Sequence, residues 1–207
     1  MTDTWTMISE TRTDLASYLE TITPEQWDTP TLCEGWKVRD VAGHLIEGSY
    51  KVPMTKLVSG MLKYRFNINR MLSELAIENG KRPPEELLKE MHDVVPLRNT
   101  PGPTSVEDVL SDWVVHTQDI RRSLGSPGTI PEDRLRGSLD RMKTSGPPLG
   151  NKKRIAGLKL VATDMDWTYG NGPEVRGTGE ALLMATCGRT AAIDDLAGDG
   201  VATLRSR

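Results

Sequence analysis

Two of the three histidines lie in segments that favour helices, at positions from which a helix can direct them inward. His44 follows the segment 38–43, and His116 lies four residues after Asp112. Residues four apart stack on one face of a helix. A carboxylate and an imidazole from one helix, with an imidazole from another, provide three ligands and leave coordination positions open. This arrangement is typical of a catalytic divalent metal, in contrast to a closed structural site.

Each of these side chains also has a structural interpretation. A histidine on the inner face of a helix can be a core residue bonded to a carbonyl group. Asp112 can point to solvent and pair with a nearby cation; if it faces inward, its burial is costly unless it is paired or bound to a metal. Asp119 can orient the imidazole of His116, but an ion pair with an arginine such as Arg39 is the favoured interpretation.

The loop over residues 29–36 carries a cysteine and a tryptophan beside the first histidine helix. Cys33 could be a nucleophile, but the sequence supplies no base for it, so a buried structural thiol is favoured. Trp27 and Trp36 are expected to hold this loop against the helices by packing. His92, at the end of a short helix, is expected to be a solvated surface residue.

The bulk composition is that of an ordinary globular protein, with 207 residues, 37% hydrophobic and 27% charged. A net charge of −3 and a pI near 5.7 argue against nucleic acid or an anionic membrane as the main partner. No apolar run approaches the roughly 20 residues that span a bilayer, no export signal is visible, and two cysteines suit a reducing compartment. We therefore expect a soluble cytoplasmic protein.

Apolar periodicity predicts a predominantly helical first part. The expected helices cover approximately residues 3–22, 37–50, 53–79, 83–92, 105–124 and 131–142. Ser105, with Asp108 three residues later, resembles a capping box at the start of the fifth. Lys37 is a poor cap for the second, because its side chain accepts no hydrogen bond.

The pattern changes after the Gly146-Pro147-Pro148 breaker. Alternation over 155–163 predicts a half-buried strand, residues 174–176 start a second strand, and 201–204 form a last short one. Thr178 caps a helix between them. The sequence therefore predicts an α+β fold with two domains, a helical bundle over residues 1–145 and a small α+β unit over residues 146–207.

Three blocks of the chain resemble the mycothiol-dependent maleylpyruvate isomerase family, part of the wider DinB-like superfamily. WDTPTLCEGWKVRDVAGHL (27–45) resembles the N-terminal signature of the family, and DWVVHTQDIRRSLG (112–125) resembles its second metal-binding helix. GLKLVATDMDWTYGNGPEVRGTGEALLMATCGR (157–189) is similar to its small C-terminal domain. The resemblance implies a DinB-like up-down helical bundle followed by this small domain.

The resemblance also implies a divalent metal, usually zinc, at His44, Asp112 and His116. The family commonly has Glu where this chain has Asp112, so the metal would sit closer to that helix, a water would bridge, or the affinity would fall. A second departure is Lys37, where a capping Thr is usual.

The activity implied by the resemblance is a thiol-dependent isomerisation or conjugation. Mycothiol would bind through its sulfur to the open metal position, where the metal holds it as a thiolate that adds to a small electrophile. Arg39, Arg122 and Arg189 are candidates for binding a substrate carboxylate. A non-catalytic metal- or ligand-binding protein of the same fold is the alternative, and a metal hydrolase that needs no thiol is a third possibility. We expect a monomer or a homodimer.

Overall fold

The computed structural model describes residues 2–51, 54–145 and 151–207. The chain forms two compact units, Met1–Gly128 and Thr129–Arg207. This division falls earlier than the one that the sequence suggests after residue 145, because α7 (Glu132–Met142) packs against α9 (Gly179–Thr186) of the second unit. The breaker at 146–148 lies outside the described residues.

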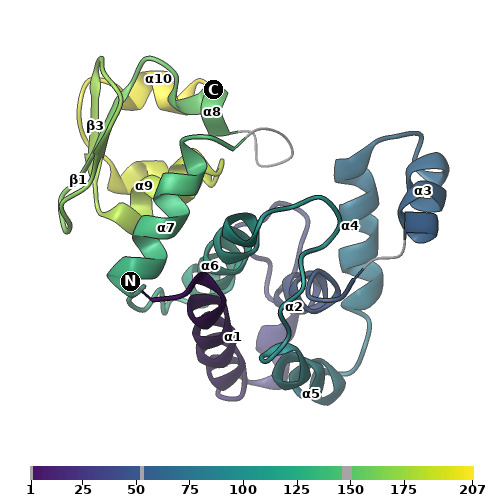
Figure 1. Ribbon diagram of the computed structural model, residues 1–207. Helices are drawn as coiled ribbons and strands as arrows, with labels where there is room; N and C mark the ends of the chain where they lie inside the picture. Colours follow the sequence, from purple (N-terminus) through teal and green to yellow (C-terminus); the bar gives the residue numbers. More distant parts are fainter. Residues whose placement is uncertain (1, 52–53, 146–150) are drawn as a thin grey trace. The chain divides into compact units, whose positions relative to one another are not determined.

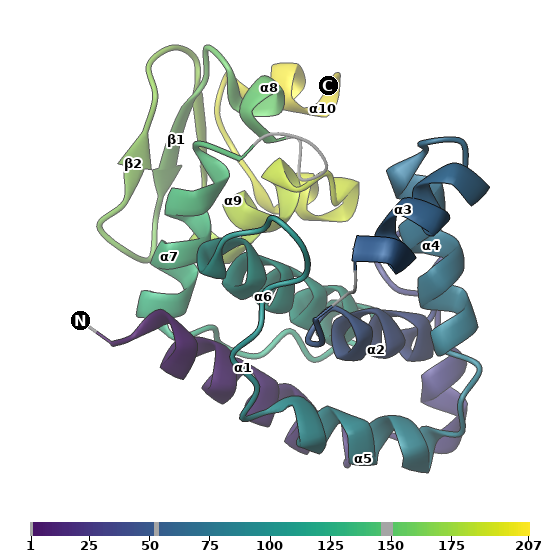
Figure 2. The ribbon, with the colours of Figure 1, turned by 45° about the vertical axis from the view of Figure 1, so that its right-hand side comes forward.

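Four helices form the bundle of the first unit: α1 (Thr4–Leu19), α2 (Val38–Glu47), α5 (Pro84–Val94) and α6 (Val106–Ser123). Both α1 and α2 pack against α5 and against α6 (Figures 1 and 2). A short 3₁₀ helix, η1 (Pro24–Asp28), precedes α2. The capping box is confirmed, because Ser105 Oγ accepts from the backbone N–H of Asp108 and Asp108 Oδ2 accepts from that of Ser105.

A buried arginine ties the helices of this bundle together. The Arg12 side chain is 0% exposed and donates from Nη1 to the carbonyl oxygens of Val94 (2.8 Å) and Leu97 (2.6 Å) and from Nη2 to Ser49 Oγ (3.1 Å). Its guanidinium also lies 5.0 Å from the ring centroid of Trp113. Burial lowers the pKa of Arg12 to about 10, so the group stays charged at neutral pH. The carbonyls at the end of α5 carry partial negative charge that favours this cation.

The prediction of one long helix over 53–79 is wrong. The described chain forms α3 (Met54–Lys63) and α4 (Ile68–Asn79) instead. Phe66 has a φ of 62°, a left-handed conformation that no right-handed helix contains. Asn67 then caps α4, because its side chain accepts a hydrogen bond from the backbone of the first turn.

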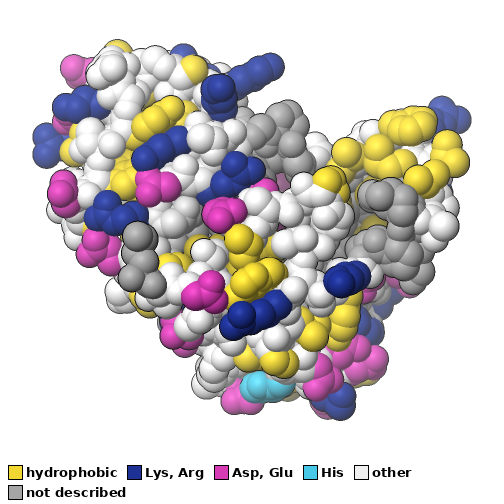
Figure 3. Space-filling model, viewed as in Figure 1, with side chains coloured by type: hydrophobic (Ala, Val, Ile, Leu, Met, Phe, Trp, Pro, Cys, Tyr) yellow, Lys and Arg dark blue, Asp and Glu magenta, His cyan; other side chains and the backbone are white. Residues whose placement is uncertain are grey.

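Apolar side chains remain exposed along α3 and α4. Figure 3 shows such side chains gathered over α3. They include Val58, Leu62, Phe66, Ile68, Leu75 and Ile77.

Two glycines bring α2 and α4 into close contact. A Cβ atom at Gly43 would lie 2.8 Å from the backbone nitrogen of Gly80, and one at Gly80 would lie 2.2 Å from Asp40 Oδ1. Asp40 also accepts from the backbone N–H of Lys37 (2.9 Å), which supports the start of α2 although Lys37 has no capping side chain. Since Gly43 precedes His44, this contact fixes how α2 presents that histidine.

The second unit contains a small sheet. Its central strand β1 (Lys159–Ala162) runs antiparallel to β2 (Thr168–Tyr169) and parallel to β3 (Glu174–Gly177). Leu160 of β1 pairs with Val175 of β3, and both side chains are buried. The two strands predicted for this region are present, and α9 packs against β1 and β3.

The last strand predicted from the sequence, 201–204, is a helix in the structure. It forms α10 (Val201–Arg205), and the chain just before it already occupies the outer edge of β3, where Ala197 pairs with Arg176. Leu204 is 0% exposed, and α10 packs against the 3₁₀ helix η2 (Thr190–Asp195). Tertiary packing therefore overrides the β propensity of this short segment.

The α+β class predicted from the sequence is confirmed, since helices predominate and a three-stranded sheet is present. The remaining short helix, α8 (Asn151–Ile155), precedes β1. Among the described residues, no helix is both long enough and apolar enough to cross a membrane.

We expect Gly43→Ala to lower the free energy of unfolding by about 1–3 kcal/mol, because the added methyl group meets the backbone of Gly80. The measurement is urea unfolding followed by circular dichroism. Gly48→Ala is the matched control at the end of the same helix, where the backbone is already helical and the new Cβ meets only carbonyls of α2. Equal stabilities of the two variants would contradict the role assigned to the contact between α2 and α4.

Candidate metal centre

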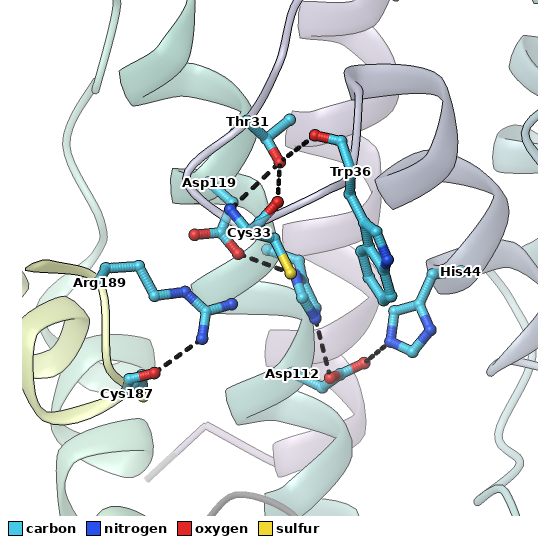
Figure 4. A network of polar contacts seen from close by, with 9 residues as sticks. Thr31, Cys33, Trp36, His44, Asp112, Asp119, Cys187 and Arg189 are labelled. Carbon is cyan, nitrogen blue, oxygen red and sulfur yellow. Dashed lines mark hydrogen bonds and ion pairs between the residues drawn. The ribbon is translucent and has the colours of Figure 1, made fainter. Parts of the chain in front are cut away.

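The structure brings His44 of α2 together with Asp112 and His116 of α6. One ligand atom from each lies within 4.8 Å of the other two. Asp112 Oδ2 is 3.5 Å from His44 Nε2, and Asp112 Oδ1 is 3.5 Å from His116 Nε2 (Figure 4). Asp112 therefore reaches both imidazoles although its side chain is one methylene shorter than that of Glu. Two nitrogens and a carboxylate form a donor set that suits zinc.

A second carboxylate of α6 holds the other nitrogen of His116. Asp119 Oδ2 lies 2.9 Å from His116 Nδ1, and Asp119 is 0% exposed. An ionised carboxylate only accepts hydrogen bonds, so Nδ1 is the donor and the lone pair of the neutral ring lies on Nε2, toward Asp112. The structure thus supports the orienting role for Asp119, which the sequence ranks below an ion pair.

Trp36 packs against both imidazoles. Its ring centroid lies 4.9 Å from that of His44 and 5.6 Å from that of His116, which it stacks against with an interplanar angle of 25°. The indole is 8% exposed and donates from Nε1 to Ser73 Oγ on α4 (3.1 Å). The sequence favours a role for Trp36 in holding its loop over one as an aromatic wall for a ligand, and nothing in its spacing relates it to α6.

Cys33 is carried by a tightly closed loop. Thr31 donates its backbone N–H to the carbonyl of Trp36 (2.8 Å), and Trp36 donates its own to the carbonyl of Cys33 (3.0 Å). The cysteine is half-buried, and its sulfur belongs with ligand atoms of His116 and Asp119 to a group that spans at most 4.8 Å. The sequence gives Cys33 no base, but the fold places an imidazole and a carboxylate beside it.

The three candidate arginines have different surroundings. Arg39 lies on α2 with its Nε 3.7 Å from Asp28 Oδ1. Arg122 is half-buried on α6, and Arg189 belongs to the C-terminal unit, where its Nη1 donates to the carbonyl of Cys187 (2.8 Å). Their assignment to a substrate carboxylate remains a prediction.

Solvent reaches the group from the side of Asp112. The side chain of Asp112 is 33% exposed, against 16% for His44 and 9% for His116. Figure 4 shows the indole of Trp36 and the carboxylate of Asp112 on different sides of the His44 ring. Asp112 is therefore the most solvent-exposed of the three side chains.

Comparison with known proteins identifies relatives of this chain. Residues 8–99 match the family model described as the mycothiol maleylpyruvate isomerase N-terminal domain. The crystal structure of the mycothiol-dependent maleylpyruvate isomerase has a TM-score of 0.64 and 14% identity, and the match covers 95% of this chain and 91% of that chain. A histidine-to-alanine mutant of that enzyme gives the same TM-score and coverage at 13% identity. No curated protein matches the sequence. At this identity, the solved structures establish a common fold.

The contact with Asp119 predicts an unusual tautomer for His116. In its neutral form, His116 should carry its proton on Nδ1, whereas His92, whose exposed ring contacts Glu20 through Nε2 (2.7 Å), should carry it on Nε2. Long-range ¹H–¹⁵N correlation spectra of the three histidines distinguish the tautomers. In Asp119→Ala, His116 should revert to the Nε2 form; an Nε2 proton in the native chain would contradict this geometry.

Proposed function

We propose that this chain, whose residues 8–99 match the mycothiol maleylpyruvate isomerase N-terminal domain, is a metal- and mycothiol-dependent isomerase or thiol transferase. The observation that carries the proposal is the convergence of His44, Asp112 and His116 from two helices on one point. Its substrate would be a small electrophile, in particular an unsaturated carboxylic acid.

The residues present fit a divalent metal such as zinc. His44 and His116 would bind through Nε2 and Asp112 through a carboxylate oxygen, and three protein ligands leave a position open for a small molecule. Asp119 would keep the proton of His116 on Nδ1 and so keep Nε2 available. When bound, the metal supplies a Lewis acid that favours the thiolate form of a small thiol at neutral pH.

The side chains around the group would serve the reaction by orientation and by exclusion of water. Trp36 fixes both imidazoles through stacking, and its own position is fixed by Ser73. The exposed side of Asp112 gives the thiol and the electrophile a common approach. An arginine, with Arg39, Arg122 and Arg189 as candidates, would bind a substrate carboxylate through paired hydrogen bonds. No nucleophile from the protein is needed, because the thiol supplies it.

Metal binding is the first test of this proposal. We expect the purified protein to take up about one zinc ion per chain, and His44→Ala, Asp112→Ala and His116→Ala to weaken zinc binding at least tenfold in competition with a chelator. His92→Ala is the matched control, since the exposed His92 lies outside the group. A native chain that takes up no zinc, even when zinc is added, would overturn the proposed function.

Thiol dependence is the second test. With zinc and mycothiol present, we expect turnover of maleylpyruvate or a related unsaturated acid, and none when the thiol is omitted. Asp112→Glu should retain turnover because it restores the carboxylate usual in the family, and Asp119→Asn should lower kcat/KM about 10- to 100-fold by releasing His116. Turnover without any thiol would favour a metal hydrolase; zinc binding without turnover of these acids would favour the non-catalytic alternative.

A further inference from the structure

A second group of metal-ligand side chains shares His116 with the first. Cys33, His116 and Asp119 each offer one ligand atom, and these atoms lie within 4.8 Å of one another. Sulfur, nitrogen and oxygen are the three donor kinds that zinc accepts in proteins. With bond lengths of about 2.0–2.3 Å, donors on one tetrahedral zinc lie about 3.3–3.5 Å apart. The His116 and Asp119 donor atoms, 2.9 Å apart, would separate by about 0.5 Å, and the sulfur of Cys33 would move inward by about 1 Å, to surround a cation.

The fold supplies both the rigidity and the access that such a position requires. Cys33 lies in a loop closed by backbone hydrogen bonds between Thr29 and Val38 (3.0 Å) and between Thr31 and Trp36 (2.8 Å). The cysteine is half-buried, so the residue keeps partial contact with solvent. His116 and Asp119 lie one turn apart on α6 and are already in contact at 2.9 Å.

The two nitrogens of the His116 imidazole face different carboxylates. Nε2 of His116 faces Asp112 at 3.5 Å, whereas Nδ1 faces Asp119 at 2.9 Å. When a cation takes the lone pair of Nδ1, the single proton of the neutral imidazole resides on Nε2, so Nε2 has no lone pair to offer the first group. The two positions therefore compete for His116.

The sulfur donor determines which cations the second group prefers. A thiolate favours soft and borderline ions such as Zn²⁺, Co²⁺ and Cd²⁺, whereas Mg²⁺ and Ca²⁺ prefer ligands that are all oxygen. Binding would form a sulfur–metal bond and release the thiol proton of Cys33 to solvent, with no change of oxidation state.

We propose that Cys33, Asp119 and His116 form a second cation position, which takes thiophilic divalent ions and competes with the His44–Asp112–His116 group for their shared imidazole. This position does not require that the first group be loaded. Cd²⁺ bound at Cys33 would withdraw His116 from the first group and would weaken zinc binding there.

Cobalt provides a direct test in the full-length chain, because a thiolate bound to Co²⁺ gives a charge-transfer absorption in the near ultraviolet. We expect titration with Co²⁺ to produce this absorption in the native protein and in Cys187→Ser, which keeps Cys33 and alters only the other cysteine. Cys33→Ser should abolish it. Asp119→Asn should shift the titration to Co²⁺ concentrations about 10- to 100-fold higher.

The cobalt test can be interpreted independently of whether the His44–Asp112–His116 group binds a metal. His44→Ala should keep the cobalt–thiolate absorption, because His44 belongs to the first group alone, whereas His116→Ala should lose it. Persistence in His44→Ala would establish the second position even if the zinc-dependent activity proposed above fails. Binding of Co²⁺ to the native chain without this absorption, or an unchanged absorption in Cys33→Ser, would overturn the proposal.

Protection from alkylation tests the position without any variant. Cd²⁺ should slow the reaction of Cys33 with iodoacetamide and leave that of Cys187 unchanged, as measured by mass spectrometry of the digested protein. Equal rates for Cys33 with and without Cd²⁺ would contradict the proposal, and this outcome does not depend on whether Cys33→Ser folds.

Discussion

The candidate site depends on the orientation of one imidazole, each of whose nitrogens faces a carboxylate of its own helix. Asp112 lies one turn before His116 and Asp119 about one turn after it, so α6 carries the ring and both of its partners. Because a helix spaces side chains at fixed intervals, α6 alone brings these three side chains together, and Trp36 stacks on the ring from its loop. If the ring turned, neither the group with His44 nor the group with Cys33 could form.

The remaining elements bring two further donors to that fixed ring. His44 comes from α2, whose approach to α4 has no space for a side chain at Gly43, so packing of backbones sets its position. Cys33 comes from a loop that closes on itself just before α2 begins, and Trp36 of the same loop contacts the ring of His44 and stacks on that of His116. The loop and α2 thus form one rigid support, and the buried Arg12 holds the helices of the bundle around it.

The parts of the structure that local spacing controls could be predicted from the sequence. The pairing of Asp112 with His116 and the α+β class follow from helical and strand periodicity, and the capping box at Ser105 follows from its residues. The break before α4 was missed because a left-handed turn at Phe66 leaves no periodic signal, although Asn67 is a typical cap. The closeness of Cys33 to α6 is a tertiary property, since no sequence spacing relates a loop to a helix that follows it much later.

The aspartate at position 112 is best understood from the shape of this site. The resemblance to the maleylpyruvate isomerase family implies a glutamate at this position, and a shorter side chain would be expected to withdraw from a ligand on another helix. Here the two oxygens of Asp112 lie at the same distance, 3.5 Å, from Nε2 of His44 and from Nε2 of His116, so α2 and α6 are close enough for the shorter carboxylate to span them. The close contact of α2 with α4 and the stacking of Trp36 fix the positions of both imidazoles. The loss of one methylene is therefore compatible with a complete donor set, and it leaves the exposed side of Asp112 as the approach for a small ligand.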